Sequence, residues 1–207
     1  MLAISVVAGG WLSLLTAADP CWAQLDPLDA RVTAWVTGET ALAATSTPAF
    51  DRPFAQGTWT FQTYGSGTWG DSDKGEIYTG HIGVGYHFVD DLSINLEGVG
   101  GWADAEKDDD GGVGGIDLLF RWHFLQGRGW SLYIDGGAGF QLATTNFPSD
   151  SHHNFRPQVG LGGTLQITDS IRLMGGARWL HISNAGTTRI NNGLDGAQLY
   201  AGIMVPF

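Results

Sequence analysis

Alternation of apolar and polar residues dominates the chain from Gly57 onward. Between residues 155 and 167, every second position is mostly apolar, as seen at Phe155, Val159, Leu161, Leu165 and Ile167. The intervening positions are small or polar. A period of two residues indicates a β-strand, because successive side chains point to opposite faces of an extended chain. We therefore predict eight strands, near residues 57–65, 76–88, 92–103, 113–125, 130–144, 155–167, 171–183 and 196–207.

The connections between these strands alternate in length. Three are short, with the sequences VDD, QGRG and TDS, whereas the connections near residues 69–75, 104–112, 146–154 and 184–195 are long, polar and rich in Gly or Asp. The strands are long enough to cross a membrane at a tilt, which takes about nine to eleven residues. Short turns at one end and long loops at the other are typical of outer-membrane barrels. We predict an all-β fold, an eight-stranded antiparallel up-and-down transmembrane β-barrel.

A soluble lipocalin-like barrel or a β-sandwich would show the same alternation, with the two faces exchanged. Two observations favour the membrane barrel. Aromatic residues such as Trp102, Trp122, Trp130 and Trp179 lie near predicted strand ends, where they would form interfacial girdles. Glycines and charged residues share the polar face, and small or paired charged groups fill the narrow interior of an eight-stranded barrel well.

Composition and charge exclude several other classes. The 207 residues suffice for one domain, and the net charge of −11 disfavours nucleic acid as a partner, because phosphate binding needs a cationic surface. Cys21 is the only cysteine, so no zinc-type cysteine spacing exists. The paired histidines at 152–153 lack a third ligand nearby, and the acidic run at 106–112 lacks the regular spacing of a calcium loop. We predict no metal site.

Residues 1–23 are interpreted as a secretory signal peptide, with an apolar run from Leu2 to Ala18 and cleavage after Ala23. A membrane-anchoring helix is the alternative, although the run is short for one. Residues 24–56 form an N-terminal segment that is either periplasmic or leads into the first strand. Residues 57–207 form the barrel.

Three polar residues interrupt the apolar face of the last two strands. In the strand near 171–183, Ile171, Leu173 and Trp179 share their parity with His181 and Ser183. Asp195 has the parity of the apolar face of the last strand, provided that the strand extends back to it. Ser, His and a carboxylate are the groups of a nucleophilic acyl-transfer site. The alternative is that they are ordinary polar residues at the membrane interface.

A longer motif resembles a known family. The segment HISNAGTTRINNGLD resembles the His-x-Ser-Asn-Ala-Gly…Asn-x-Gly-x-acid segment of the outer-membrane lipid A 3-O-deacylases (acyloxyacyl hydrolases). The resemblance implies a bacterial outer-membrane serine esterase without a cofactor, whose partner is lipopolysaccharide and whose reaction removes the 3-hydroxyacyl chain at the 3-position of lipid A. A non-enzymatic barrel with a structural or adhesive role is the alternative. The oligomeric state is left open.

The resemblance also assigns roles to individual residues. It implies that Ser183 is the nucleophile, His181 the general base and Asp195 the acid, at a position where the family usually has Glu. Asn184, Gly186 and Asn191 become candidates for the oxyanion hole, which stabilises charge on the attacked carbonyl. Their alternative role is turn formation, since Asn and Gly favour loop conformations.

Overall fold

The computed structural model describes residues 52–70, 75–105, 110–148, 150–191 and 193–207. The predicted signal peptide and all but the last five residues of the segment 24–56 lie outside the described residues. Within the described ranges, no helix is long and apolar enough to cross a membrane.

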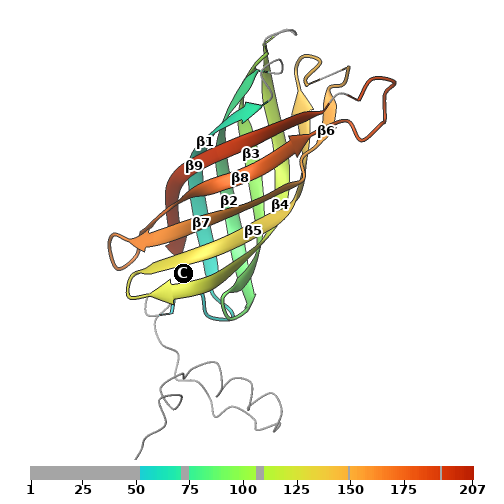
Figure 1. Ribbon diagram of the computed structural model, residues 1–207. Coiled ribbons are helices and arrows are strands. Elements are labelled where there is room, and N and C mark those ends of the chain that lie inside the picture. Colours follow the sequence, from blue (N-terminus) through green and yellow to red (C-terminus); the bar gives the residue numbers. More distant parts are fainter. Residues whose placement is uncertain (1–51, 71–74, 106–109, 149, 192) are drawn as a thin grey trace, which may run out of the picture. The chain divides into compact units, whose positions relative to one another are not determined.

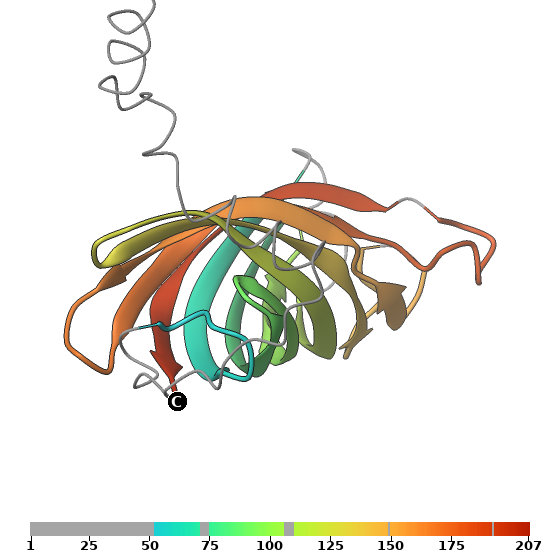
Figure 2. The same ribbon diagram turned by 90° about the horizontal axis from the view of Figure 1, so that it is seen from below.

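Antiparallel strands form a closed barrel (Figure 1). They are β1 (Trp59–Gly70), β2 (Glu76–Val89), β3 (Leu92–Asp104), β4 (Gly111–Gly127), β5 (Trp130–Ala143), β6 (His153–Phe155), β7 (Gln158–Gln166), β8 (Arg172–Ile182) and β9 (Leu194–Pro206). β1 pairs with β2 and also with β9, and this pairing joins the first strand to the last. The view from below shows the ring of strands end-on (Figure 2).

The prediction of eight barrel strands is confirmed, because β6 and β7 together occupy one position in the ring. Both pair with β5, and the residues between them are Arg156 and Pro157. Proline has no backbone N–H to donate, so a regular ladder cannot run through it. Arg156 nevertheless exchanges backbone hydrogen bonds with Gly139 of β5, at 2.9 and 3.1 Å, which keeps the two pieces in register.

Several strand boundaries differ from the predicted ones, by five residues at the end of β1 and by one or two elsewhere. β1 extends to Gly70 rather than ending near residue 65, and β9 begins at Leu194 rather than at residue 196. In both cases the end of the strand is polar or rich in Gly, a composition that predicts a loop. The closed ring supplies each of these ends with a partner: Trp69 pairs with Glu76, and Leu194 pairs with Ile182.

The apolar face of the sheet points outward and the polar face inward, as predicted for a membrane barrel. Leu161, Ile116 and Ile82 are each about 60 % exposed (60, 60 and 58 %) on the outer wall. Six charged residues, in contrast, lie inside and are almost completely buried: Glu97, Asp117, Arg121, Asp135, Arg156 and Arg178. A soluble barrel would have the two faces exchanged, so this arrangement excludes that alternative.

An ion-pair network crosses the barrel interior. The guanidinium groups of Arg121 and Arg178 lie 2.9 and 2.8 Å from the same carboxylate oxygen of Asp135. Gln62 donates a hydrogen bond to Glu97 at 2.7 Å and accepts one from Arg121 at 2.6 Å. Because a buried charge is costly unless it is paired and hydrogen-bonded, the network satisfies groups that would otherwise destabilise the barrel. It also fills the interior, in keeping with a packed barrel rather than a pore.

The described end of the N-terminal segment closes the turn end of the barrel. Phe54 is 2 % exposed and stacks on the His123 ring, with centroids 3.6 Å apart. Its carbonyl accepts a hydrogen bond from the N–H of Asp91 in the β2–β3 turn at 2.7 Å. The first residue of β1, Trp59, and the last residue of β9, Pro206, also lie at this turn end of the barrel. The longer connections lie at the opposite end.

Candidate active site at the loop end of the outer wall

His181 and Asp195 form a side-chain pair near the loop end of β8 and β9. They are directly opposed in the antiparallel register, and Nδ1 of His181 lies 3.0 Å from Oδ1 of Asp195. Opposed residues of an antiparallel pair project from the same face with their Cβ atoms close together, which explains how the short side chain of Asp reaches the ring. Both side chains are partly exposed, at 29 and 51 %, on the outer wall.

This pairing fixes how the imidazole is oriented. When Nδ1–H donates to the Asp195 carboxylate, Nε2 is left unprotonated and able to accept a proton. The backbone N–H of His181 donates to the carbonyl of Pro157 at 3.0 Å, which ties this end of β8 to the chain before β7. The indole ring of Trp179 stacks on the imidazole, with centroids 5.9 Å apart and planes at 21°. Trp179 was not predicted to contact the site, although its position two residues before His181 on the same face gave the signal.

Ser183 follows His181 by two residues and lies one residue beyond β8. Its backbone exchanges hydrogen bonds with Phe155 of β6, at 2.8 and 3.1 Å, in an isolated antiparallel bridge. Phe155 is 45 % exposed on the outer wall, and opposed residues share a face, so the Ser183 side chain belongs to that wall as well. Ser183 itself is 8 % exposed.

The structure contains a hydrogen bond between the side chains of His181 and Asp195. Among the described residues, the Ser183 hydroxyl makes no hydrogen bond to the imidazole. In proteins without bound substrate, the bond between a nucleophile and its base is often long or poorly aligned. Of the contacts expected among these three residues, the structure contains the one between His181 and Asp195, and a catalytic role for the three stays a prediction.

The three oxyanion-hole candidates lie in the connection after Ser183. Asn184 is completely buried, and its amide nitrogen donates to Thr188 Oγ1 at 2.6 Å and to the Ile190 carbonyl at 2.7 Å. Its amide oxygen accepts the N–H of Gly186 at 2.9 Å. Asn191 is exposed and lies near the end of this connection in the sequence.

Asn184 and Gly186 thus take part in a tight turn. The N–H of Thr187 donates to the carbonyl of Asn184 at 3.0 Å, and the two residues between them, Ala185 and Gly186, have positive φ angles of 52° and 76°. Two positive φ values in the centre define a type I′ turn, in which Gly is favoured. These contacts correspond to the turn-forming role that the sequence left open. A role in the oxyanion hole stays a prediction.

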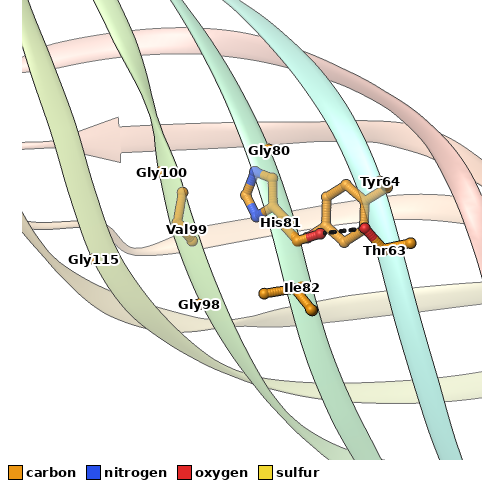
Figure 3. A pocket seen from close by; sticks show the side chains of 9 residues that line it. All are labelled: Thr63, Tyr64, Gly80, His81, Ile82, Gly98, Val99, Gly100 and Gly115. Atoms are coloured by element: carbon orange, nitrogen blue, oxygen red, sulfur yellow. Dashed lines mark hydrogen bonds between the residues drawn. The ribbon is translucent and has the colours of Figure 1, made fainter.

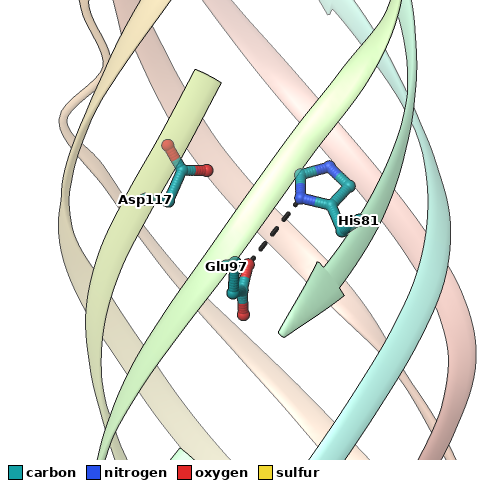
Figure 4. A group of neighbouring side chains, drawn as sticks. All are labelled: His81, Glu97 and Asp117. Carbon is teal, nitrogen blue, oxygen red and sulfur yellow. Dashed lines mark ion pairs between the residues drawn. The ribbon is translucent and has the colours of Figure 1, made fainter. Parts of the chain in front are cut away.

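A cluster of residues with metal-ligand side chains lies inside the barrel rather than at the site. His81, Glu97 and Asp117 gather there from neighbouring strands (Figure 4), with candidate ligand atoms within 4.8 Å of one another. Guanidinium groups already face both carboxylates: Arg121 lies 3.8 Å from Glu97, and Arg156 lies 3.8 Å from Asp117. These cations compensate the negative charge that would attract a metal ion. We therefore assign the cluster to the interior ion-pair network.

A hollow of about 470 Å³ opens elsewhere, on the wall formed by β1–β4 (Figure 3). Three of its lining residues, Gly80, Gly98 and Gly100, occupy outward positions of β2 and β3 and leave the wall without side chains there. None of the residues lining this hollow belongs to the group of His181, Ser183 and Asp195. The hollow is part of the outer wall and not of the candidate site.

Comparison with known proteins relates the chain to one enzyme family. The family described as lipid A 3-O-deacylase (PagL) matches residues 42–204. A search of curated proteins finds no match.

Several solved structures have a similar fold. The crystal structure of the outer membrane enzyme PagL superimposes with a TM-score of 0.57 at 16 % identity, covering 72 % of this chain and 99 % of that one. Neisserial surface protein A (NspA) gives a TM-score of 0.55 at 16 % identity, with coverages of 72 and 96 %. The outer membrane protein OprG from Pseudomonas aeruginosa gives 0.54 at 10 % identity, with coverages of 74 and 97 %. At these identities the structural matches establish the fold.

Proposed function

The chain belongs to the lipid A 3-O-deacylase (PagL) family, and from this premise we propose that Ser183, His181 and Asp195 carry its esterase chemistry. The protein is a lipid A deacylase of the bacterial outer membrane, and family membership decides against the purely structural or adhesive alternative. The observation that supports the assignment of residues is the pair formed by His181 and Asp195, with Nδ1 and Oδ1 3.0 Å apart on the outer wall.

In the proposed reaction, Ser183 Oγ attacks the carbonyl carbon of the ester at the 3-position of lipid A. Nε2 of His181 takes the hydroxyl proton, while Asp195 holds the imidazole by Nδ1 and stabilises its positive charge. The tetrahedral intermediate collapses, the sugar 3-oxygen leaves with the proton from His181, and an acyl-enzyme remains. Water, activated by the same imidazole, then releases the 3-hydroxy fatty acid and regenerates Ser183.

The position of the site suits a substrate that lies in the membrane. Lipid A occupies the outer leaflet, and its acyl esters lie near the boundary between headgroups and hydrocarbon. His181 and Asp195 lie at the end of the apolar wall, just below the long loops, so the ester can reach them sideways from the leaflet. No cofactor takes part in this scheme.

Substitution of the proposed nucleophile and base tests the assignment. We expect Ser183→Ala and His181→Ala to leave lipid A untrimmed in cells that produce each variant, as measured by mass spectrometry of extracted lipid A. His153→Ala and Ser170→Ala are matched controls, because both residues are exposed and outside the proposed group, and these variants should trim lipid A as the parent does. Full trimming by the Ser183 and His181 variants, at equal amounts of folded barrel, would refute the assignment.

A further inference from the structure

The motif that carries Asp195 also contains a glycine, Gly193, for which the reaction scheme gives no role. Gly193 lies directly before β9, two residues before Asp195. Its φ angle is outside the left-handed region that favours glycine, since the glycines with positive φ among the described residues are Gly57, Gly75, Gly129 and Gly186. Backbone conformation therefore does not explain why residue 193 is a glycine.

The surroundings of Gly193 give a different reason. A Cβ atom added to Gly193 would lie 2.7 Å from Cε1 of the His181 ring and 3.1 Å from its Nε2. It would also lie 3.0 Å from the carbonyl oxygen of Ile182. Separations below 3.0 Å are shorter than van der Waals contact permits, so any side chain at residue 193 has to displace the imidazole.

The register of the two strands explains this contact. His181 is opposed to Asp195 and Ile182 to Leu194, so Gly193 comes directly before the last paired residue of β9. In an extended chain, residues two apart point to the same face. A side chain at residue 193 would therefore project on the same wall as that of Asp195, against the Cε1–Nε2 edge of the imidazole.

We propose that Gly193 is a positioning residue, whose missing side chain lets the His181 imidazole stay within hydrogen-bond distance of Asp195 with its Nε2 edge uncovered. The proposal rests on the function assigned above to His181. Three groups then define the position of the ring: the Asp195 carboxylate at Nδ1, the Trp179 indole on one face, and the Gly193 backbone at the Cε1–Nε2 edge.

The test compares Gly193→Ala with the parent on purified lipid A in detergent micelles. We expect kcat to fall by about 10- to 100-fold, because misplacing a catalytic group by up to 1 Å costs rates of this order, while KM changes by less than about twofold. Gly100→Ala is the matched control, since a Cβ there meets no atom within 4 Å, and it should keep the parent kcat. A Gly193→Ala variant with the parent kcat would overturn the proposal.

A second readout does not depend on activity. In protein labelled with ¹⁵N-histidine, the ring nitrogen signals of His181 should shift in Gly193→Ala, while those of the other histidines stay in place. Unchanged His181 signals would contradict the proposal. If His181→Ala leaves kcat unchanged, the proposed function fails, but the signal shift still tests the contact between Gly193 and the ring.

A double variant covers the case in which Gly193→Ala does not fold. If the collision with the imidazole is what prevents folding, then Gly193→Ala combined with His181→Ala should restore the folded barrel, seen as its faster migration on unheated gels. A double variant that also fails to fold would overturn the proposal, because the damage would then come from contacts other than the imidazole.

Discussion

His181 and Asp195 are direct cross-strand partners of β8 and β9, and their side chains form a hydrogen bond 3.0 Å long on the outer wall of the barrel. The residue proposed as the acid therefore lies in the sheet itself and not in a loop. Direct opposition brings the Cβ atoms to about 4.5–5.5 Å, a gap that the side chains of Asp and His span together without distortion. An aspartate can therefore stand where the family usually has Glu.

The identity of the acid gives the first prediction. Asp195→Asn keeps the size of the side chain but loses the charge, so we expect kcat to fall by about 10²- to 10⁴-fold with little change in KM, because the imidazole loses its orientation and its counter-charge. Asp195→Glu should retain kcat within about tenfold, since the longer carboxylate can still reach Nδ1. Steady-state kinetics on purified lipid A measures both, and an Asn variant as fast as the parent would remove Asp195 from the mechanism.

Asn184 provides a test that separates its two possible roles. Its amide makes three hydrogen bonds inside the connection after Ser183. Asn184→Ala should loosen this connection at a cost of about 1–3 kcal/mol, because the connection loses three hydrogen bonds. Hydrogen–deuterium exchange in residues 184–190 should then accelerate together with a fall in kcat, whereas Asn191→Ala, at an exposed residue, should leave the exchange unchanged. Unchanged exchange with a large loss of kcat would instead assign Asn184 to the oxyanion hole.

The interior network makes a prediction about stability. Asp135 is the closest carboxylate to both Arg121 and Arg178. We expect Asp135→Ala to lower the free energy of unfolding by about 3–5 kcal/mol, because it leaves buried guanidinium groups without their partner. Urea-induced unfolding in lipid bilayers measures this change. Asp169→Ala, in the exposed β7–β8 turn, should shift the free energy by less than about 0.5 kcal/mol, and an equal effect of the two variants would contradict the expectation.

The lipid-facing wall can be tested along a single strand. Leu118 lies near the middle of β4 and is 45 % exposed, whereas Leu125 lies near its turn end and is 48 % exposed. Leu118→Arg should destabilise the barrel in a bilayer by about 2–4 kcal/mol, and Leu125→Arg by about 0–1 kcal/mol, because the cost of a charge falls from the bilayer midplane to the interface. Similar values for the two variants would contradict the orientation of the barrel in the membrane.

Much of the fold follows from local pattern. The alternation around Leu161 and the charges at Glu97 and Arg178 define two faces, and the lengths of the connections define two ends. Strand boundaries follow less well from the sequence, because the ends at Gly70 and Leu194 are held in strand conformation by their partners on neighbouring strands, Gly196 and Ile182. Pro157 divides one predicted strand into β6 and β7, although proline in a strand already signalled a break.

The sequence by itself determined the period of two, the separation of apolar from charged faces, and the order of His181, Ser183 and Asp195, because these depend only on residue identity and spacing. Closure of the barrel decided the rest. It turned the polar face inward, set Asp195 opposite His181 and placed the imidazole next to Gly193, where a Cβ atom would collide with it. Such contacts join residues through the register between strands, and register is fixed by the closed hydrogen-bonded ring rather than by any one segment.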